Sequence, residues 1–344
     1  MARVLLIGNP TAQSGKNAAR IEKARELFAA HGVQAELFPT LPGGGTIPAV
    51  AARVSEGRDT TLVAMGGDGT FREVAAGILA ASARERVAMG MLPTGTANDQ
   101  GKSFGLAASE DALARNVQVV VAAHETRLDA GVLELLDEGG APLRTERFFD
   151  SAGWGLSARV LATRNRDREW VAKLGPLREL YRDQLVYAGA LLRTFVEAQV
   201  TDDKFSAAVE ADGVSTTFHG LTDLVVKGTR IYGGAWVFDP SSRHDDGKFE
   251  LVVFRGKREW ASKAIVDLDG NPVSEAMLNR IGVEHSKPLS AARFEITLAA
   301  EGEVPVFAQI DGEELESAPL VRIRVEPRAL RLIVPDDRGA SSLP

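Results

Sequence analysis

Short apolar runs alternate with amphipathic stretches over the first third of the chain. Four of the runs have the length of buried strands, and we assign them to residues 4–8, 34–38, 61–65 and 87–92. The stretches between and after them carry apolar residues at helical spacing, which predicts helices at 17–30, 47–55, 71–81 and 110–116. Such alternation is typical of a parallel sheet with helices on both faces. We therefore expect an α/β domain over residues 1–124.

The pattern changes near residue 125, where strand-like segments follow one another. They predict a mainly antiparallel, β-rich domain over 125–327, with residues at about 328–338 as candidates to return to the first domain. These segments lie at 125–136, 144–155, 204–213, 222–233, 247–256, 292–302, 304–315, 320–327 and 330–335. One long helical region, at about 157–198, interrupts them.

The composition is that of a globular protein and narrows the function classes. Of 344 residues, 25% are charged and 44% are hydrophobic. The net charge of −7 argues against a nucleic-acid binder with a broad basic surface. The lack of cysteine excludes disulfides, thiolate catalysis and cysteine-based zinc sites. All apolar stretches fall far short of the ~20 residues that a membrane-spanning helix needs, so we expect a cytoplasmic protein.

The junction after the third predicted strand is rich in glycine, with Gly66, Gly67, Asp68, Gly69 and Thr70 in succession. Glycines let the main chain approach a bound group closely, and a helix that begins here offers free N–H groups to a phosphate. A tight turn capped by Asp68 or Thr70 is the alternative. We favour phosphate binding, because a turn does not require three glycines. A carboxylate repels phosphate, so Asp68 is best explained as a ligand of Mg²⁺.

The loop after the first strand, "NPTAQSGK" at 9–16, is a near miss of a Walker A phosphate-binding loop. The glycine-lysine pair is present, but Asn17 follows where that loop needs Ser or Thr. Asn9, Thr11 and Ser14 remain as hydrogen-bonding groups for a phosphate or a ribose. A helix cap by Ser14 or Asn17 explains the same residues equally well, and the sequence leaves both open.

A third polar loop, "PTGTAND" at 93–99, follows the fourth strand and ends in a second carboxylate, Asp99. Parallel strands end at one edge of their sheet, where ligands of such folds bind. We therefore expect the three loops to converge on a single ligand.

Two acidic turns in the second domain have a structural and a functional interpretation each. Asp245 and Asp246 precede a glycine and a strand, so a turn is expected and a cation site is the alternative. Asp311, Gly312 and Glu313 form the sequence of a hairpin turn, although a general base would look the same.

The stretch at 159–182 is basic, and the apolar residues behind it recur at helical spacing. A helix with a solvated basic face is the default interpretation. Docking on an anionic membrane surface is the alternative.

Taken together, these loops resemble the diacylglycerol kinase catalytic-domain family of lipid kinases. That family includes bacterial diacylglycerol and related lipid kinases, sphingosine kinases and ceramide kinases. The similarity covers nearly the whole chain, from "NPTAQSGK" through "GGDGT", "PTGTAND" and "SAGWG" to "DDGKFEL" and "DGE". "GGDGT" alone is shared with NAD kinases and phosphofructokinases, whereas the ordered set is specific.

The resemblance implies a fold and a set of residue roles. The fold is an α/β domain like that of phosphofructokinase and NAD kinase, a β-rich second domain, and an ATP site in the cleft between them. Asp68 and Asp99 would organise Mg²⁺, Glu313 would be the general base, with Glu314 left open, and Asp245 or Asp246 would match a structural cation site. The residues implied to hold ATP are Asn9, Thr11, Ser14, Gly15, Thr40, Gly66, Gly67, Asp68, Gly69, Thr70, Thr94, Gly95, Thr96 and Asn98.

The implied activity is an ATP- and Mg²⁺-dependent lipid kinase that phosphorylates diacylglycerol, a sphingoid base or ceramide at the inner membrane surface. No nucleic-acid partner is expected, and a homodimer is left open. Two alternatives remain, a kinase of a soluble alcohol such as an NAD kinase, and a nucleotide-binding regulator without catalysis. Segments at 137–147, 159–182 and 266–290 exceed the small bacterial members and leave the lipid undecided.

Overall fold

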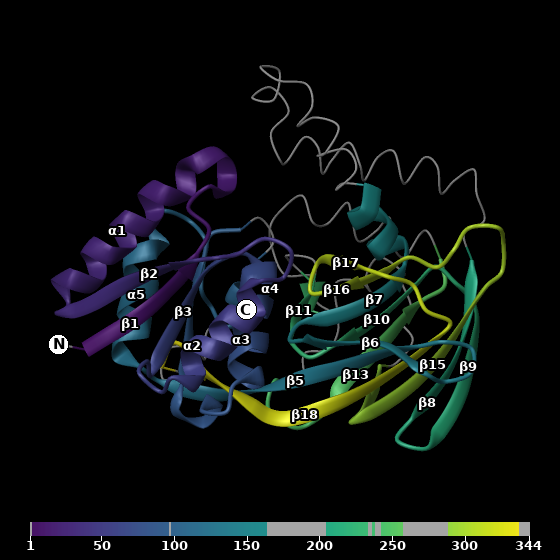
Figure 1. Ribbon diagram of the computed structural model, residues 1–344. Coiled ribbons are helices and arrows are strands. Elements are labelled where there is room, and N and C mark those ends of the chain that lie inside the picture. The colour runs from purple at the N-terminus through teal and green to yellow at the C-terminus, as the bar shows by residue number, and fades with distance from the viewer. Residues whose placement is uncertain are drawn as a thin grey trace.

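The computed structural model describes residues 2–95, 98–163, 204–232, 236–237, 242–256 and 288–336. Figure 1 shows an α/β part, which contains the N-terminus, beside a β-rich part. This is the two-part architecture that the change of pattern near residue 125 predicts.

The α/β part is built on four parallel strands. Along the sheet they lie in the order β2 (Val33–Pro39), β1 (Ala2–Gly8), β3 (Thr61–Gly66) and β4 (Ala88–Pro93). Alternate residues of β1 enter two different cores, with Leu6 on one face of the sheet and Leu5 and Ile7 on the other. Both faces of the sheet are therefore covered, which explains the nearly continuous apolar runs of its strands.

Helices pack on both faces of this sheet. The helices α1 (Lys16–Ala30) and α5 (Ala112–Ala122) contribute to one core, and α2 (Thr46–Ser55) and α3 (Asp68–Ala80) to the other. The short α4 (Asp99–Ser103) follows β4. The predicted end of the fourth helix at 116 is wrong, because Val117 and Val120 continue its apolar face and are buried against the strands.

The β-rich part contains a six-stranded antiparallel sheet. Its strands lie in the order β14 (Leu289–Ala291), β13 (Phe249–Phe254), β10 (Asp223–Lys227), β7 (Ser151–Gly155), β16 (Ala308–Ile310) and β17 (Glu313–Leu315). A separate two-stranded ribbon joins β11 (Ile231–Tyr232) to β12 (Trp236–Val237). The predicted segments at 144–155 and 304–315 each hold two strands, because a turn divides each of them.

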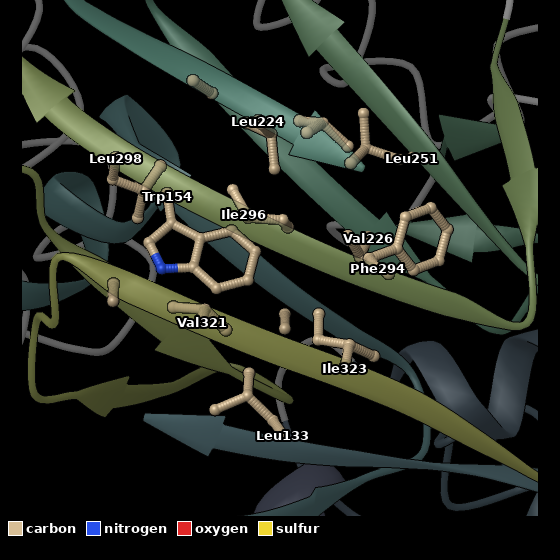
Figure 2. Close-up of a cluster of buried hydrophobic side chains, with 14 of the residues drawn as sticks. Leu133, Trp154, Leu224, Val226, Leu251, Phe294, Ile296, Leu298, Val321 and Ile323 are labelled. Carbon is tan, nitrogen blue, oxygen red and sulfur yellow. The ribbon is translucent and has the colours of Figure 1, made fainter. Parts of the chain in front are cut away.

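A second sheet packs against the six-stranded one. It includes β5 (Glu125–Leu136), β6 (Pro142–Phe148), β8 (Phe205–Ala211), β9 (Val214–Leu221), β15 (Arg293–Ala300) and β18 (Leu320–Ile333). Figure 2 shows the core between the two sheets, where Trp154 and Leu224 of one sheet meet Ile296 and Val321 of the other. The alternation of buried and exposed residues along β15 follows from this arrangement, since its other face is exposed.

Strand β18 connects the two parts. It pairs with β5 along its whole length and meets β4 in parallel at Leu332 and Met89, so the second sheet is continuous with the parallel one (Figure 1). The sequence predicts two strands here, but the structure has one strand with an irregularity between Glu326 and Leu330. Pro327 has no N–H group to donate, and Arg328 has a positive φ of 52°, which accounts for the break in pattern.

Several expectations lie wholly or largely outside the described residues. These are the basic helical stretch beyond residue 163, the segment at 266–290 up to residue 287, and the chain after 336. The extra segment at 137–147 is described, and it forms the turn between β5 and β6 together with most of β6. Within the described ranges, no helix is both long and apolar enough to cross a membrane.

Candidate active site

The predicted phosphate-binding loops all lie at the carboxyl edge of the parallel sheet. They follow β1, β3 and β4, which are neighbours in that sheet. Thr40, at the end of β2, is tied to the same edge because its N–H donates to the Gly8 carbonyl at 3.2 Å. The strand order therefore gathers residues that lie up to 90 positions apart in the chain.

The loops after β3 and β4 touch through their glycines. A Cβ added to Gly95 would lie only 2.5 Å from the Gly67 Cα atom, and the Thr94 N–H donates to the Gly66 carbonyl at 2.9 Å. Side chains at Gly67 and Gly95 would force the loops apart, so glycine is required by the close approach of two backbones.

Helix α3 begins within the first of these loops. Gly67 is its N-cap residue, and among the described side chains none caps it, so the expected alternative of a cap by Asp68 or Thr70 is wrong. The Thr70 hydroxyl instead lies over Gly66. A Cβ added to Gly66 would be only 2.3 Å from the Thr70 Oγ1 atom. The backbone N–H groups in the first turn of this helix point toward the loop and would suit an anionic ligand such as a phosphate.

The loop after β1 is shaped by its own side chains. Asn9 Oδ1 accepts hydrogen bonds from the Thr11 N–H at 2.9 Å and from the Thr11 hydroxyl at 2.8 Å. Gly15, with a φ of 87°, is the N-cap residue of α1, and no side chain in the described set caps that helix. Asn17 donates to the Asn9 carbonyl at 2.7 Å, so the alternative of an Asn17 cap is wrong, while the side chain of Ser14 lies outside the described residues.

Asn98 shapes the loop after β4. It adopts a left-handed conformation, and its amide group accepts from the Gly95 N–H at 2.8 Å and donates to the Gly95 carbonyl at 2.7 Å. These two bonds fix the shape of the loop, and the role of Asn98 toward ATP stays a prediction. Thr96 lies outside the described residues.

Asp68 meets the segment that carries Asp99. The Gln100 N–H donates to Asp68 Oδ1 at 3.2 Å, which brings Asp68 to the backbone of the segment that carries the second candidate magnesium ligand. Burial raises the pKa of Asp68, while hydrogen bonds from backbone N–H groups at Asn98, Asp99 and Gln100 act in the opposite direction. Removal from water penalises the ionised carboxylate, and a bound cation would relieve that penalty.

The residues at this edge fit an ATP–Mg²⁺ complex. The donor set is two carboxylates beside a glycine-lined backbone, and the buried amide of Gln100 has no hydrogen-bond partner at either end within the described part of the chain. Among those residues no three His, Asp or Glu side chains gather as a metal site. Two carboxylates are what a Mg²⁺ ion requires when phosphate oxygens and water complete its coordination.

Glu313 reaches this site from the β-rich part. The hairpin of β16 and β17 turns through Asp311 and Gly312, which both have positive φ angles, of 46° and 76°. A Cβ on Gly69 would lie 2.6 Å from Glu313 Oε1, so the carboxylate rests against the loop that holds Asp68. Glu314 is the next residue of β17, opposite Gln309 in the ladder, so its side chain points to the other face of the hairpin. The geometry favours Glu313 over Glu314.

Charged residues are buried behind this hairpin, and the sequence alone does not predict their burial. Asp150, Asp311 and Lys227 are all buried where β7, β10 and β16 end. The one signal available was a lysine in the otherwise apolar run "LVVKG", since buried lysines are rare unless paired.

Asp311 makes stability depend on pH. Burial and the nearby Asp150 raise the pKa of Asp311 to about 7, against ~4 in an unfolded chain. Its contribution to the free energy of unfolding is thus fully present below pH ~4 and is lost as the pH rises through 7, at ~1.4 kcal/mol per pKa unit. Between pH 5 and pH 8 we expect the melting temperature of the wild-type protein to fall more than that of Asp311→Asn. Parallel melting profiles of the two proteins would contradict this.

The second expected cation site is set apart from these groups. Asp245 contacts the guanidinium groups of Arg243 at 3.2 Å and Arg328 at 3.4 Å, and Asp246 accepts from the Lys248 N–H at 3.0 Å. The nearby Asp129 binds the N–H groups of Gly247 and Arg328, both at 2.6 Å. These contacts satisfy the carboxylates without a cation, and the cation site stays a prediction.

Known proteins match both parts of the chain. Residues 3–133 match the family model "Diacylglycerol kinase catalytic domain", and residues 171–334 match "YegS C-terminal NAD kinase beta sandwich-like domain". A protein of Enterobacter sp. (strain 638), named "Probable lipid kinase YegS-like", is 41% identical over 280 residues, which cover 80% of this chain and 79% of that protein.

Two solved structures share the fold. The structure of a diacylglycerol kinase from Bacillus anthracis str. Sterne has a TM-score of 0.67 at 20% identity and covers 96% of both chains. Yeast NADH kinase complexed with NADH has a TM-score of 0.51 at 11% identity, over 99% of this chain and 87% of that one.

Proposed function

Because the chain belongs to the diacylglycerol kinase family of lipid kinases, we propose that it transfers the γ-phosphate of ATP to the hydroxyl group of a membrane lipid. The acceptor class comprises diacylglycerol and related lipid alcohols, including sphingoid bases and ceramide. The reaction would take place at the inner surface of the membrane.

One observation carries this proposal: the carboxylate of Glu313 lies against Gly69, one residue from Asp68. The contact joins a candidate proton acceptor from the β-rich part to a candidate phosphate and metal site in the α/β part. Figure 1 shows the corresponding elements facing each other, with β16 and β17 on the side of the β-rich part toward α4. A hydroxyl group bound between them would have both the groups that phosphoryl transfer requires.

The role proposed for each residue follows from the chemistry of phosphoryl transfer. The reaction depends mainly on positioning and on neutralising charge, which backbone N–H groups at the start of α3 and the glycine loops supply. Mg²⁺ held by Asp68 and Asp99 would neutralise charge on the phosphate oxygens. A lipid alcohol is a weak nucleophile near pH 7, so Glu313 would accept its proton, which typically contributes ~10²–10⁴-fold.

A substrate panel tests the proposal. The purified full-length protein is given labelled ATP and Mg²⁺ together with diacylglycerol, sphingosine or ceramide in detergent micelles, and with NAD in a parallel reaction. We expect label in at least one lipid and none in NAD. Label in NAD alone would replace the proposal by a soluble-alcohol kinase. Nucleotide binding without transfer to any acceptor would favour a regulator.

A further inference from the structure

Asp150 ties together three strands of the six-stranded sheet. Its carboxylate accepts hydrogen bonds from the hydroxyl groups of Ser151, at 3.2 Å, and Thr229. Its carbonyl accepts from the Gly228 N–H at 2.8 Å, and its own N–H donates to Asp311 Oδ1 at 2.8 Å. The ends of β7, β10 and β16 are therefore joined through one residue.

Asp311 fixes the turn that carries Glu313. Its carboxylate also accepts from the N–H groups of Phe149 at 2.9 Å and Ser151 at 3.0 Å, and its N–H donates to the Ser151 carbonyl at 2.8 Å. Because Asp311 is itself in the left-handed region, its backbone orientation determines where the next residues of the turn lie. The direction of Glu313 thus depends on the segment 149–151.

Lys227 is a buried positive charge near the two buried carboxylates, Asp150 and Asp311. It is fully buried at the end of β10, directly across from Ser151 of β7. Burial raises the pKa of Asp150 to about 6, and the positive charge of Lys227 acts against that rise. A buried carboxylate with two hydroxyl donors and a lysine nearby is held in one orientation far more firmly than a solvated one.

We propose that Asp150 and Lys227 are positioning residues, which hold the Asp311 turn and thereby keep the Glu313 carboxylate against the loop of Asp68. This role rests on the proposed lipid kinase reaction. It predicts that the pair acts mainly on the transfer step, because Asp150 forms its hydrogen bonds with Ser151, Thr229 and Asp311. The Asp150 carboxylate also lies close enough to Asp68 for their charges to interact, and this interaction raises the pKa of Asp150.

Two variants and one control separate positioning from stability. Asp150→Asn removes one acceptor and the negative charge that interacts with Lys227, whereas the double variant Asp150→Asn/Lys227→Gln removes both charges. The control is Asp223→Asn, at the other end of β10, whose buried carboxylate accepts from the hydroxyl of Ser157 at 2.9 Å. All rates are measured with the full-length protein below the melting temperature of every variant.

We expect Asp150→Asn to lower kcat for lipid phosphorylation by ~10–100-fold with an unchanged KM for ATP, since small displacements of a catalytic group have effects of that order. The double variant should regain melting temperature but not kcat, and Asp223→Asn should keep wild-type kcat. In a Glu313→Gln background Asp150→Asn should have no further effect on kcat. Wild-type kcat in Asp150→Asn, or an equal additional loss in that background, would overturn the proposal.

Hydrogen exchange tests the same role without a lipid. The Gly312 N–H is held by Gln309 Oε1 at 2.9 Å, so exchange in the peptide that spans 308–315 reports the order of the turn. We expect faster exchange there in Asp150→Asn than in the wild type, and no change in Asp223→Asn. Unchanged exchange in Asp150→Asn would refute the positioning role. A wild-type protein that is inactive on every lipid would refute the proposed function, whereas the exchange experiment would still test how Asp150 holds the turn.

Discussion

Replacement of Glu313 by glutamine is expected to lower kcat for lipid phosphorylation by ~10²–10⁴-fold and to leave ATP binding unchanged. Glutamine keeps the size of the side chain and one accepting oxygen but cannot take the proton of the acceptor hydroxyl. Because the side chain contacts Gly69 through one carboxylate oxygen, the substitution should not move the loop. Initial rates with a lipid acceptor, together with ATP affinity from calorimetry, measure the two effects separately.

The matched control for this experiment is the next residue. Glu314 is also exposed and carries the same charge, but successive side chains of a strand point to opposite faces, so it faces away from the side on which Glu313 lies. We expect Glu314→Gln to keep a rate within a few-fold of the wild type. A large loss in Glu314→Gln with near-normal turnover in Glu313→Gln would transfer the role of base to Glu314.

Asp68→Asn should slow the reaction and weaken the binding of Mg²⁺. The substitution deletes a negative charge where the metal and the phosphates would meet, and we expect kcat to fall by ~10²–10³-fold. The concentration of Mg²⁺ that gives half-maximal activity should rise at the same time, by ~10–100-fold. Rates measured over a series of Mg²⁺ concentrations at saturating ATP provide both numbers.

Asp59→Asn is the control for Asp68. Asp59 is a buried carboxylate just before β3, whereas Asp68 follows the same strand. Asp59 forms an ion pair with Arg53 at 2.6 Å. Its loss should lower the melting temperature without changing the response to Mg²⁺. An unaltered magnesium curve in Asp68→Asn would exclude Asp68 as a metal ligand.

The loops of the α/β part could be predicted from the sequence because their constraints are local. Gly67 and Gly95 are required by close backbone contacts at the ends of strands, and strand ends are visible as the ends of apolar runs. The end of α5 is not evident from the sequence, since "VQVVVAA" has the composition of a strand as well as of a helix face. Helical burial of Val117 and Val120 decided between the two.

The buried charges could not be predicted in the same way. Asp150 and Asp311 are 161 positions apart, and each looks like an ordinary turn residue in its own segment. Only the pairing of β16 with β7 places the Asp311 carboxylate on the backbone N–H groups at 149–151. Lys227 joins them because β10 is the other neighbour of β7.

The sequence by itself determined the fold class and the three glycine-containing loops, because apolar periodicity and short glycine motifs are set by neighbours along the chain. The ordered set of these motifs carried the resemblance to the family. The tertiary structure alone decided that Glu313 faces the loop of Asp68, that β18 ties the two parts together, and that buried charges lie behind the hairpin. These features depend on strand order and register. Both result from long-range packing of the whole chain, which no local stretch of sequence encodes.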